Sequence, residues 1–418
     1  MPSAPRLNST VQVCQDQRPG RWEIQDIQTA LSSHDDWDVL AESTSSIPMA
    51  ESWWMRCWWK HFAPPGETLF VHRLLSADSL KAVIPLAYKR GLVRAQSWPC
   101  NPHTPLVGIP LSVEPVAAFS SLLEHLKSSA EYLELPAVSV DAGDGVYASL
   151  VEVIRRSKLP FIKYDLPGSS YLDYGESWPA LRSSLSRNII STTERHHRQL
   201  SRMGRLQVCR ITRRTELDAP LQECFALEMA SWKGVNRSAM ASKPATLGFY
   251  TDLAKAAADA GALSLYTLRL DGKLIAFDYS LTRRGIVYLL KLSYDAALAK
   301  YSPSNVLLRL RLQDEIENRT ATRYDFGIAS AWKLRWTRKV SRVVFFRIYL
   351  DHPRARTAYY LGPALRSRIK SLPFVAQVVG SIREARNTRK QARHARLRGQ
   401  VRDQAPVTDE LRPGAEGD

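Results

Sequence analysis

The 418-residue chain is long enough for two or three domains, and its content of 44% hydrophobic and 24% charged residues is that of a globular protein. Its five cysteines are far apart and form no Cys-x-x-Cys pair, which argues against a disulfide framework or a cysteine-rich zinc site and favours a reducing compartment. Neither a secretory signal nor a bilayer-spanning apolar run is visible, so we expect a soluble, cytoplasmic protein.

The net charge of +17 is concentrated near the C-terminus. Residues 353–399 contain twelve Lys or Arg and one acid, whereas residues 400–418 contain two Arg and five acids. We therefore predict a disordered N-terminus at 1–22, a basic helical tail at 353–399 and a disordered acidic end at 400–418. The tail is either a solvated basic helix or the site of an anionic partner, tRNA or the inner membrane face, where the protein would then be peripheral.

Residues 23–175 are predicted to form a first domain. A Trp-rich helix at 51–62 precedes three strands, a Pro-rich loop at 99–110, a helix at 114–130 and a strand at 132–138. The helical spacing of the tryptophan pairs at 53–54 and 58–59 favours core or interdomain packing over stacking on bases. His103, in the Pro-rich loop, is a candidate base for this half.

Residues 176–352 repeat the same order of elements. A basic helix lies within 177–204, and a helix at 245–260 precedes the strand at 262–270. Asp271-Gly272 then indicates a two-residue hairpin turn. Strands follow at 273–281 and 286–292, then a loop at 302–305 with its helix, and a strand at 322–328. The repeated α-β-β-β-α-β order predicts an α+β protein with two tandem domains, each a mixed, mostly antiparallel sheet flanked by helices.

Several stretches of the second half resemble the GNAT superfamily of N-acyltransferases, in its CelD-like branch associated with cellulose biosynthesis. They are RHHRQLSRMG at 195–204, SPSNVLL at 302–308 and YDFGIASAWK at 324–333. The duplicated order is similar to that of the Fem-type aminoacyl transferases, which pair two GNAT-like domains. The resemblance covers about residues 180–340 well and residues 30–180 by topology.

The resemblance implies transfer of an acyl group, most often acetyl, from acyl-CoA to an amine acceptor, without a metal. The strand at 286–292 would offer a backbone N–H to the developing oxyanion, and the helix start at 302–305 would hold the pyrophosphate of CoA. By the same resemblance, Asp325 would orient or deprotonate the amine and Lys333 would neutralise a phosphate or the oxyanion. Tyr294 would protonate the leaving thiolate. The expected CoA-binding residues are Leu290, Leu292, Ser302, Ser304, Asn305 and Val306.

Two alternatives remain open. A Fem-like enzyme would take its aminoacyl group from charged tRNA, with the basic helix at 182–205 on RNA phosphates. A non-catalytic GNAT-like binding protein is favoured by Ser304, which stands where the family usually has glycine, and opposed by the retained Asp325 and Lys333. The acceptor, a small-molecule or sugar amine in polysaccharide or envelope metabolism, is not encoded in any readable motif, and neither is the oligomeric state.

Overall fold

A computed structural model describes residues 20–32, 35–89 and 93–360 of the chain. The described residues up to 356 belong to one compact unit, and all that follows concerns this unit. Residues 353–356, at the end of this unit, are helical. The predicted N-terminal segment up to residue 19, the basic tail from residue 361 to 399 and the acidic end at 400–418 lie outside the described residues.

The described residues form a twelve-stranded sheet in the order β1-β2-β3-β4-β5-β12-β6-β11-β10-β9-β8-β7. The strands are β1 Arg21–Asp26, β2 Thr68–Ser76, β3 Ser79–Lys89, β4 Ala95–Ser97, β5 Tyr132–Ser139, β6 Phe161–Asp173, β7 Leu206–Ile211, β8 Leu263–Leu270, β9 Lys273–Arg283, β10 Ile286–Tyr294, β11 Arg323–Ile328 and β12 Val340–Tyr349. Only β4 with β5 and β10 with β11 are parallel neighbours. The mixed, mostly antiparallel character predicted from the sequence is confirmed.

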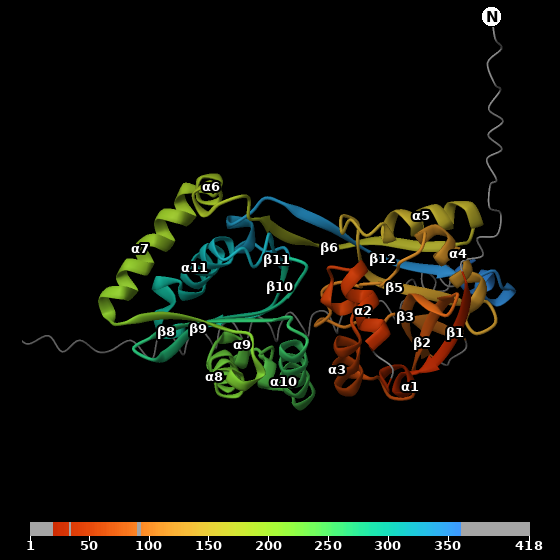
Figure 1. Ribbon diagram of the computed structural model, residues 1–418, viewed down its shortest axis with the longest axis horizontal. Helices are drawn as coiled ribbons and strands as arrows, with labels where there is room; N and C mark the ends of the chain where they lie inside the picture. The colour runs from red at the N-terminus through yellow and green to blue at the C-terminus, as the bar shows by residue number, and fades with distance from the viewer. Residues whose placement is uncertain (1–19, 33–34, 90–92, 361–418) are drawn as a thin grey trace, which may run out of the picture. The chain divides into compact units, whose positions relative to one another are not determined.

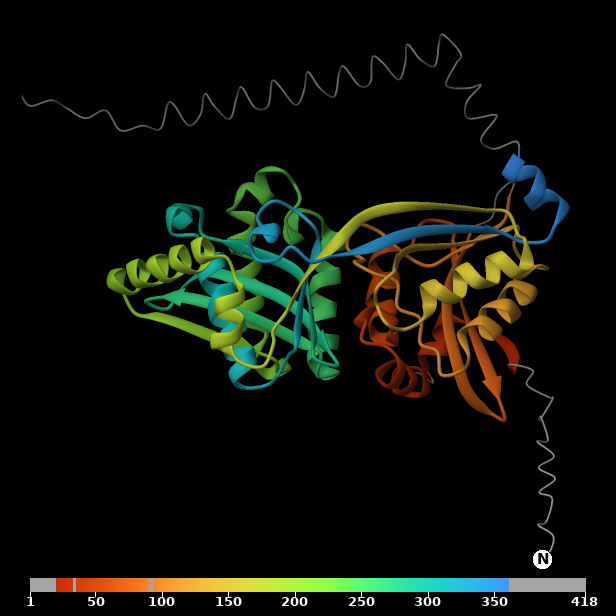
Figure 2. The same cartoon turned by 90° about the horizontal axis from the view of Figure 1, so that it is seen from above.

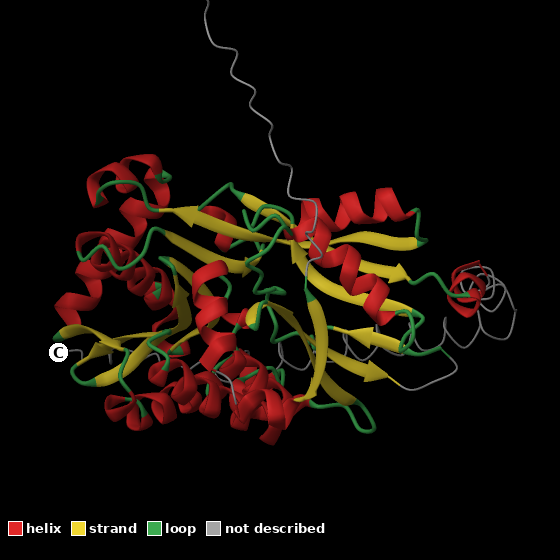
Figure 3. Ribbon diagram, turned by 45° about the vertical axis from the view of Figure 1, so that its right-hand side comes forward, coloured by secondary structure: helices red, strands yellow, loops and turns green. Residues whose placement is uncertain are grey.

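Helices flank the strands on both sides (Figure 3). The α-helices are α1 Ile27–Ser32, α2 Asp35–Thr44, α3 Ser52–Phe62, α4 Pro115–Leu126, α5 Val146–Ser157, α6 Trp178–Ser184, α7 Arg187–Met203, α8 Asp218–Met229, α9 Trp232–Val235, α10 Pro244–Asp259 and α11 Pro303–Glu317. In the second half, α6, α7 and α11 lie on one side of the strands and α8 to α10 lie on the other (Figure 1). The two sides of this sheet therefore carry different helices.

The two halves of the chain share strands. β12, from the end of the second half, lies between β5 and β6, and β6 in turn pairs with β11. Figure 2 shows the long β6 and β12 running from one half to the other. A boundary at residue 175/176 thus describes the order along the chain, while the sheet continues across it.

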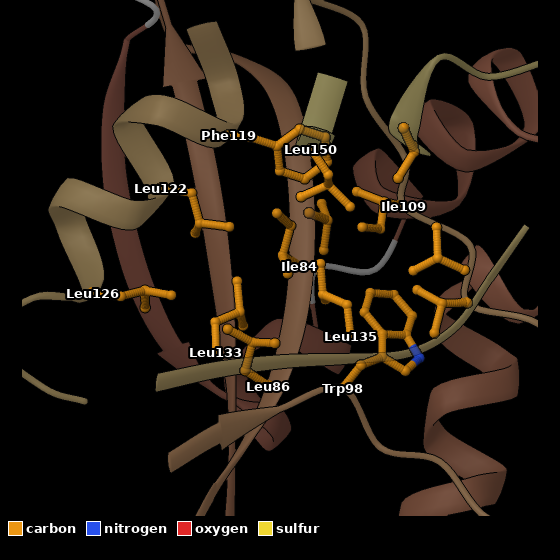
Figure 4. Close-up of a cluster of buried hydrophobic side chains, with 14 of the residues drawn as sticks. Ile84, Leu86, Trp98, Ile109, Phe119, Leu122, Leu126, Leu133, Leu135 and Leu150 are labelled. Atoms are coloured by element: carbon orange, nitrogen blue, oxygen red, sulfur yellow. The ribbon is translucent and has the colours of Figure 1, made fainter. Parts of the chain in front are cut away.

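The first half is held by one large apolar core. Buried side chains of β2 to β5 pack against α4 and α5, and Figure 4 shows Phe119, Leu122 and Leu126 projecting from α4 toward Ile84 and Leu133 of the sheet. These α4 residues recur at helical spacing, which places them on one face of the helix. The local start of α4 is equally well determined, because the Glu114 carboxylate accepts hydrogen bonds from the N–H groups of Val116 and Ala117.

The hairpin predicted at Asp271-Gly272 is confirmed. Asp271 has φ 49° and Gly272 has φ 81°, so both central residues adopt the left-handed conformation that a type I′ turn requires. The turn sets the register of β8 with β9, in which Leu270 lies opposite Lys273. On its other edge β9 pairs with β10, the strand on which the site described below is built.

The Trp-rich helix α3 packs between the halves, as its spacing predicted. Trp53, Trp54 and Trp58 are buried in one cluster with side chains of α10, among them Phe249. The Trp54 and Phe249 rings meet edge to face, with centroids 5.5 Å apart. These tryptophans are consequently part of a packed interior and offer no face for stacking on bases.

Candidate active site

The candidate site opens where two neighbouring parallel strands separate. β10 and β11 pair over only three residues, ending at Tyr288 opposite Asp325. Beyond that point β11 stays paired with β6, while β10 stays paired with β9. After Tyr288, β10 therefore has no strand partner on its β11 side, and a wedge opens between the strands.

A bulge lies in β10 at the mouth of this wedge. The register with β9 passes from Leu289 opposite Ser280 to Lys291 opposite Tyr279, so Leu290 has no partner residue in β9. A bulge leaves a residue outside the ladder and turns its peptide groups away from the regular direction. Polar backbone groups are thus available here at the edge of a cavity.

A pocket of about 640 Å³ fills the wedge. Its wall combines the β10 segment from Leu289 to Tyr294, the start of α11, the segment after β11 and residues of α9. Of the residues predicted from the sequence, this pocket brings together Leu290, Leu292, Tyr294, Ser302, Ser304, Asn305 and Lys333. Val306 is buried instead in the cluster beneath α11, next to Leu200 and Tyr266.

The helix α11 begins at the pocket. Ser302 precedes it with φ 46° and ψ 58°, and Pro303 occupies the first helical position, where its missing N–H costs nothing. Ser304 lies within the helix and does not have a positive φ, so a glycine at this position is not required by backbone conformation. The Asn305 side chain accepts a hydrogen bond from the Trp336 indole at 3.0 Å, which fixes the helix start to the segment after β11.

Replacing Ser302 with glycine is expected to raise the free energy of unfolding by about 0.5–1 kcal/mol. A left-handed non-glycine residue costs roughly 1–2 kcal/mol, and the added freedom of glycine in the unfolded chain returns part of that gain. Urea unfolding followed by circular dichroism measures the difference. The matched control is Ser304→Gly, which removes a side chain from a helical position and should destabilise; equal effects of the two variants would contradict the conformational argument.

Lys333 closes one end of the pocket. It lies at the start of the short helical turn η5 (Lys333–Arg335), and its Nζ donates to the carbonyls of Phe326 and, at 2.8 Å, Ile328. Gly327 between them has φ 69°, a conformation that glycine adopts without strain and that turns both carbonyls toward the amine. Burial lowers the pKa of Lys333 to about 8, against the attraction of the Asp325 carboxylate.

Asp325 does not line this pocket. Neighbouring residues of a strand point to opposite faces, and while Tyr324 and Phe326 pack beneath α11, Asp325 faces a small cavity of about 40 Å³. Its Oδ1 accepts hydrogen bonds from Ser169 Oγ at 2.5 Å and from the Gly327 N–H at 2.7 Å. Burial raises the pKa of this carboxyl. The geometry lets Asp325 hold the Gly327 turn, and its direct action on an amine stays a prediction.

Two further lysines line the pocket and were not among the residues chosen from the sequence. The Nζ of Lys233 donates to Glu228 Oε1 at 2.8 Å and to the carbonyl of Leu292 at 2.5 Å. Lys291 extends from the bulged strand over the ring of Tyr250, with its Nζ 5.1 Å from the ring centre. A lysine inside the otherwise apolar run IVYLLKL was the signal that could have identified Lys291.

His103, the candidate base of the first half, is held against the second half. Its Nδ1 lies 3.0 Å from the Tyr250 hydroxyl, and its ring stacks on Phe62. Burial, followed by the charges of Lys291 and Lys243, lowers the pKa of His103 to about 4. His103 is therefore neutral at physiological pH, and it contacts the same Tyr250 side chain over which Lys291 lies.

Among residues 20–360 that the structure describes, no group of three or more His, Cys, Asp or Glu is placed to hold a metal ion. No helix in the same part of the chain combines the length and the apolar character needed to cross a bilayer.

Comparison with known proteins finds a family model that matches part of the second half and solved structures that resemble the described body. Residues 187–334 match the model of the Acetyltransferase (GNAT) domain. The crystal structure of FemX covers 81% of this chain and 100% of its own, with a TM-score of 0.55 and 11% identity. A tandem GNAT protein from the clavulanic acid biosynthesis pathway covers 79% of this chain and 99% of its own, with a TM-score of 0.43 and 11% identity.

A protein of unknown function from Bacteroides thetaiotaomicron VPI-5482 matches over 79% of this chain and 100% of its own, with a TM-score of 0.49 and 13% identity. No curated protein matches the sequence. The predicted α+β fold class, with a mixed sheet flanked by helices, is confirmed, and the match to the acetyltransferase domain falls on the second half. Membership of the CelD-like branch stays a prediction.

Proposed function

We propose that the protein is an N-acyltransferase that moves an acyl group, with acetyl as the expected one, from acyl-CoA to an amine acceptor. The observation that carries the proposal is the wedge between β10 and β11. It places a bulged strand, with unpaired backbone groups, and the start of a fifteen-residue helix on the wall of one pocket. Acyl-CoA would supply the thioester carbonyl on which the amine acts.

The start of α11 fits an anionic donor. The start of a helix is the positive end of its macrodipole, which favours phosphate. The N–H groups of Ser302 and Asn305 donate to the carbonyls of Ala299 and Ser302 at 3.0 and 2.9 Å, and Pro303 has no N–H, so the backbone donor for a phosphate would be Ser304. The hydroxyl groups of Ser302 and Ser304 and the amide of Asn305 add neutral polar groups, and the pocket lining contains no carboxylate. Ser304 takes the space that glycine would leave open, and the helical backbone beneath it is unstrained.

The bulged strand and Lys333 would stabilise the charge that develops during transfer. The amine nitrogen bonds to the carbonyl carbon while the carbon–sulfur bond breaks, and negative charge passes through the carbonyl oxygen to the sulfur. An N–H near Leu290 and the ammonium of Lys333 would stabilise that charge. Tyr294, on the same wall, would supply the proton that converts the thiolate to a thiol, and the proton that the amine nitrogen loses would return through solvent to the tyrosinate.

Binding of CoA tests this proposal directly. Calorimetry should show that CoA binds the full chain, that adenosine, which lacks the pyrophosphate, binds far more weakly, and that Ser304→Gly binds CoA more tightly. The last result follows because removing the hydroxymethyl group lets the helix backbone approach the phosphates. Absence of binding at high micromolar CoA would contradict the acyl-CoA proposal.

The second candidate, transfer from aminoacyl-tRNA, is favoured by the exposed face of α7. Arg187, Arg195, Arg198 and Arg202 all lie exposed along this helix. Such a row suits a phosphate backbone. A salt-dependent gel shift with tRNA that survives deletion of residues 361–418 would support this candidate. If a variant with glutamine at all four arginines still shifts the tRNA, α7 is not the RNA surface.

The third candidate, a binding protein without catalysis, predicts CoA or acceptor binding without thiol release. A small-molecule or sugar amine of polysaccharide or envelope metabolism remains the proposed acceptor, in a cytoplasmic protein that is peripheral at the inner membrane face if its basic tail binds there. The acceptor class rests on the sequence resemblance, and the location rests on the spacing of the cysteines and on the basic tail.

A further inference from the structure

The pocket has two chemically different sides. The start of α11 lies on the side of β10 where Val287 and Leu289 pack beneath that helix. On the other side of the sheet, Tyr288 and Leu290 belong to the cluster of α8 and α10. Lys291 reaches over Tyr250 of α10, and Lys233 bonds to Glu228 of α8. Both lysines are therefore on the α8–α10 side, across β10 from the start of α11.

On the α8–α10 side, the pocket wall contains two lysines, Lys233 and Lys291, and no carboxylate. Glu228 is fully buried behind Lys233, and its second oxygen accepts the N–H of Met240 at 2.7 Å, so this carboxylate is fully used. Among the described residues, the Nζ of Lys291 makes no ion pair or hydrogen bond. It lies over the face of the Tyr250 ring. Burial lowers the pKa of Lys291, Lys233 adds to this effect, and Glu228 opposes it.

Lys291 is partly buried. A partly buried ammonium without a carboxylate partner is less stable than a solvated one, and an anion placed beside it removes much of that cost. The pyrophosphate of a donor at α11 would lie across the strand and would leave Lys291 without a partner. An acceptor consisting only of an ammonium group would be repelled by Lys233 and Lys291. An acceptor with an acidic group beside its amine would instead be attracted and oriented.

We propose that the α8–α10 side of the pocket is the acceptor subsite and that it takes amines carrying an anionic group, a carboxylate or a phosphate, held by Lys291 with Lys233. This inference names the acceptor class of the proposed acyltransferase. That the bound amine is an acceptor rests on the proposed function. Lys291 is a specificity-determining residue in this arrangement, and the amine of the substrate would point toward the bulge of β10.

Calorimetry on the full chain at low ionic strength tests the subsite without requiring turnover. The probes are two matched pairs: β-alanine against 3-aminopropanol for a carboxylate, and phosphoethanolamine against ethanolamine for a phosphate. In at least one pair, the member with the anionic group should bind about tenfold more tightly than the member without it, the factor that about 1.4 kcal/mol provides. Which pair shows the difference identifies the anionic group.

Variants separate Lys291 from general attraction. Lys291→Met should abolish the difference within a pair and Lys291→Arg should retain it, while Lys158→Met, an exposed lysine beside α5, should leave it unchanged. Circular dichroism and the unfolding midpoint show whether Lys291→Met is folded. If it is not, Lys291→Arg tests the proposal by itself. Equal binding of the two members of each pair to Lys291→Arg would then count against the proposal.

The inference is overturned if the two members of each pair bind the wild-type protein equally, if the difference within a pair survives Lys291→Met, or if no probe binds. A parallel assay of thiol release from acetyl-CoA with the same four amines addresses the proposed function. Selective binding without thiol release would count against acyl transfer alone and would leave the anionic subsite in place.

Discussion

Replacing Arg311 with methionine is expected to lower the free energy of unfolding by about 3–5 kcal/mol, the usual cost of removing one partner from a buried ionic network. Arg311 is completely buried, and it donates to Asp278 at 2.7 Å and to Glu315 at 3.0 Å. The Tyr324 hydroxyl donates to Asp278 and the Tyr174 hydroxyl donates to Glu315. Without the guanidinium, two buried carboxylates would remain without their cation. Urea unfolding followed by tryptophan fluorescence measures the loss.

The matched controls for Arg311 separate burial from charge. Arg155→Met breaks an exposed pair with Glu152 on α5 and should leave the unfolding midpoint unchanged, because exposed pairs are screened by water. Arg311→Lys keeps the charge and cannot reproduce the planar set of contacts, so its loss should be smaller than that of Arg311→Met. An unchanged midpoint for Arg311→Met would show that the network does not support the fold.

Replacing Lys333 with methionine is expected to lower kcat/KM by about 10²–10³, the range for loss of one donor to a developing oxyanion. The fold should persist, because the side chain is replaced by one of similar length and its two acceptors, the carbonyls of Phe326 and Ile328, lie near the pocket. Thiol release from acetyl-CoA, with an amine that the wild-type protein accepts, measures the change. Asp325→Asn should lower turnover less, since Asp325 contacts the Gly327 turn and not the pocket.

The pH dependence of Lys333 gives a second readout. Its pKa is about 8 in the folded chain, so the ammonium form is present below that pH and is lost above it. Activity that needs the ammonium should fall as pH rises through about 8, and Lys333→Arg should remove this fall because arginine stays charged. Activity that rises through the same range would instead identify Lys333 as a base.

Stability should change in the opposite direction. The folded-state pKa of Lys333 lies below the ordinary value of 10.5, so the unfolded chain binds more protons between about 8 and 10.5. The contribution of this group to the free energy of unfolding therefore rises with pH in that window. Lys333→Met should remove this rise from the stability profile.

Local sequence was sufficient where a few neighbouring residues decide the conformation. A type I′ hairpin turn requires two left-handed residues in a row, and Asp-Gly is one of the few dipeptides that adopt this conformation readily. The Trp-rich helix repeats its rings at helical spacing, so a buried face was the direct expectation. The loop before α11 was found by the same means, because proline at the first helical position marks a helix start.

β6 was not predicted, because Pro167 and Gly168 within it are poor strand residues, and its pairing with both β12 and β11 depends on partners far along the chain. α5 was also not predicted, and the turn DAGDG at 141–145 comes directly before it. In the structure this turn leads into the helix, with Gly145 in left-handed conformation as its N-cap.

The family resemblance named seven of the residues that line the pocket. The sequence by itself determined the two α-β-β-β-α-β halves and the β10–loop–α11 segment. These depend on periodicity and on turn residues, which act within a few positions. Only the tertiary structure decided that β10 and β11 separate after Tyr288, that Asp325 faces away from the pocket and that Lys233 joins Lys291 there. Strand separation and the meeting of distant side chains depend on packing between elements, and no single segment encodes that packing.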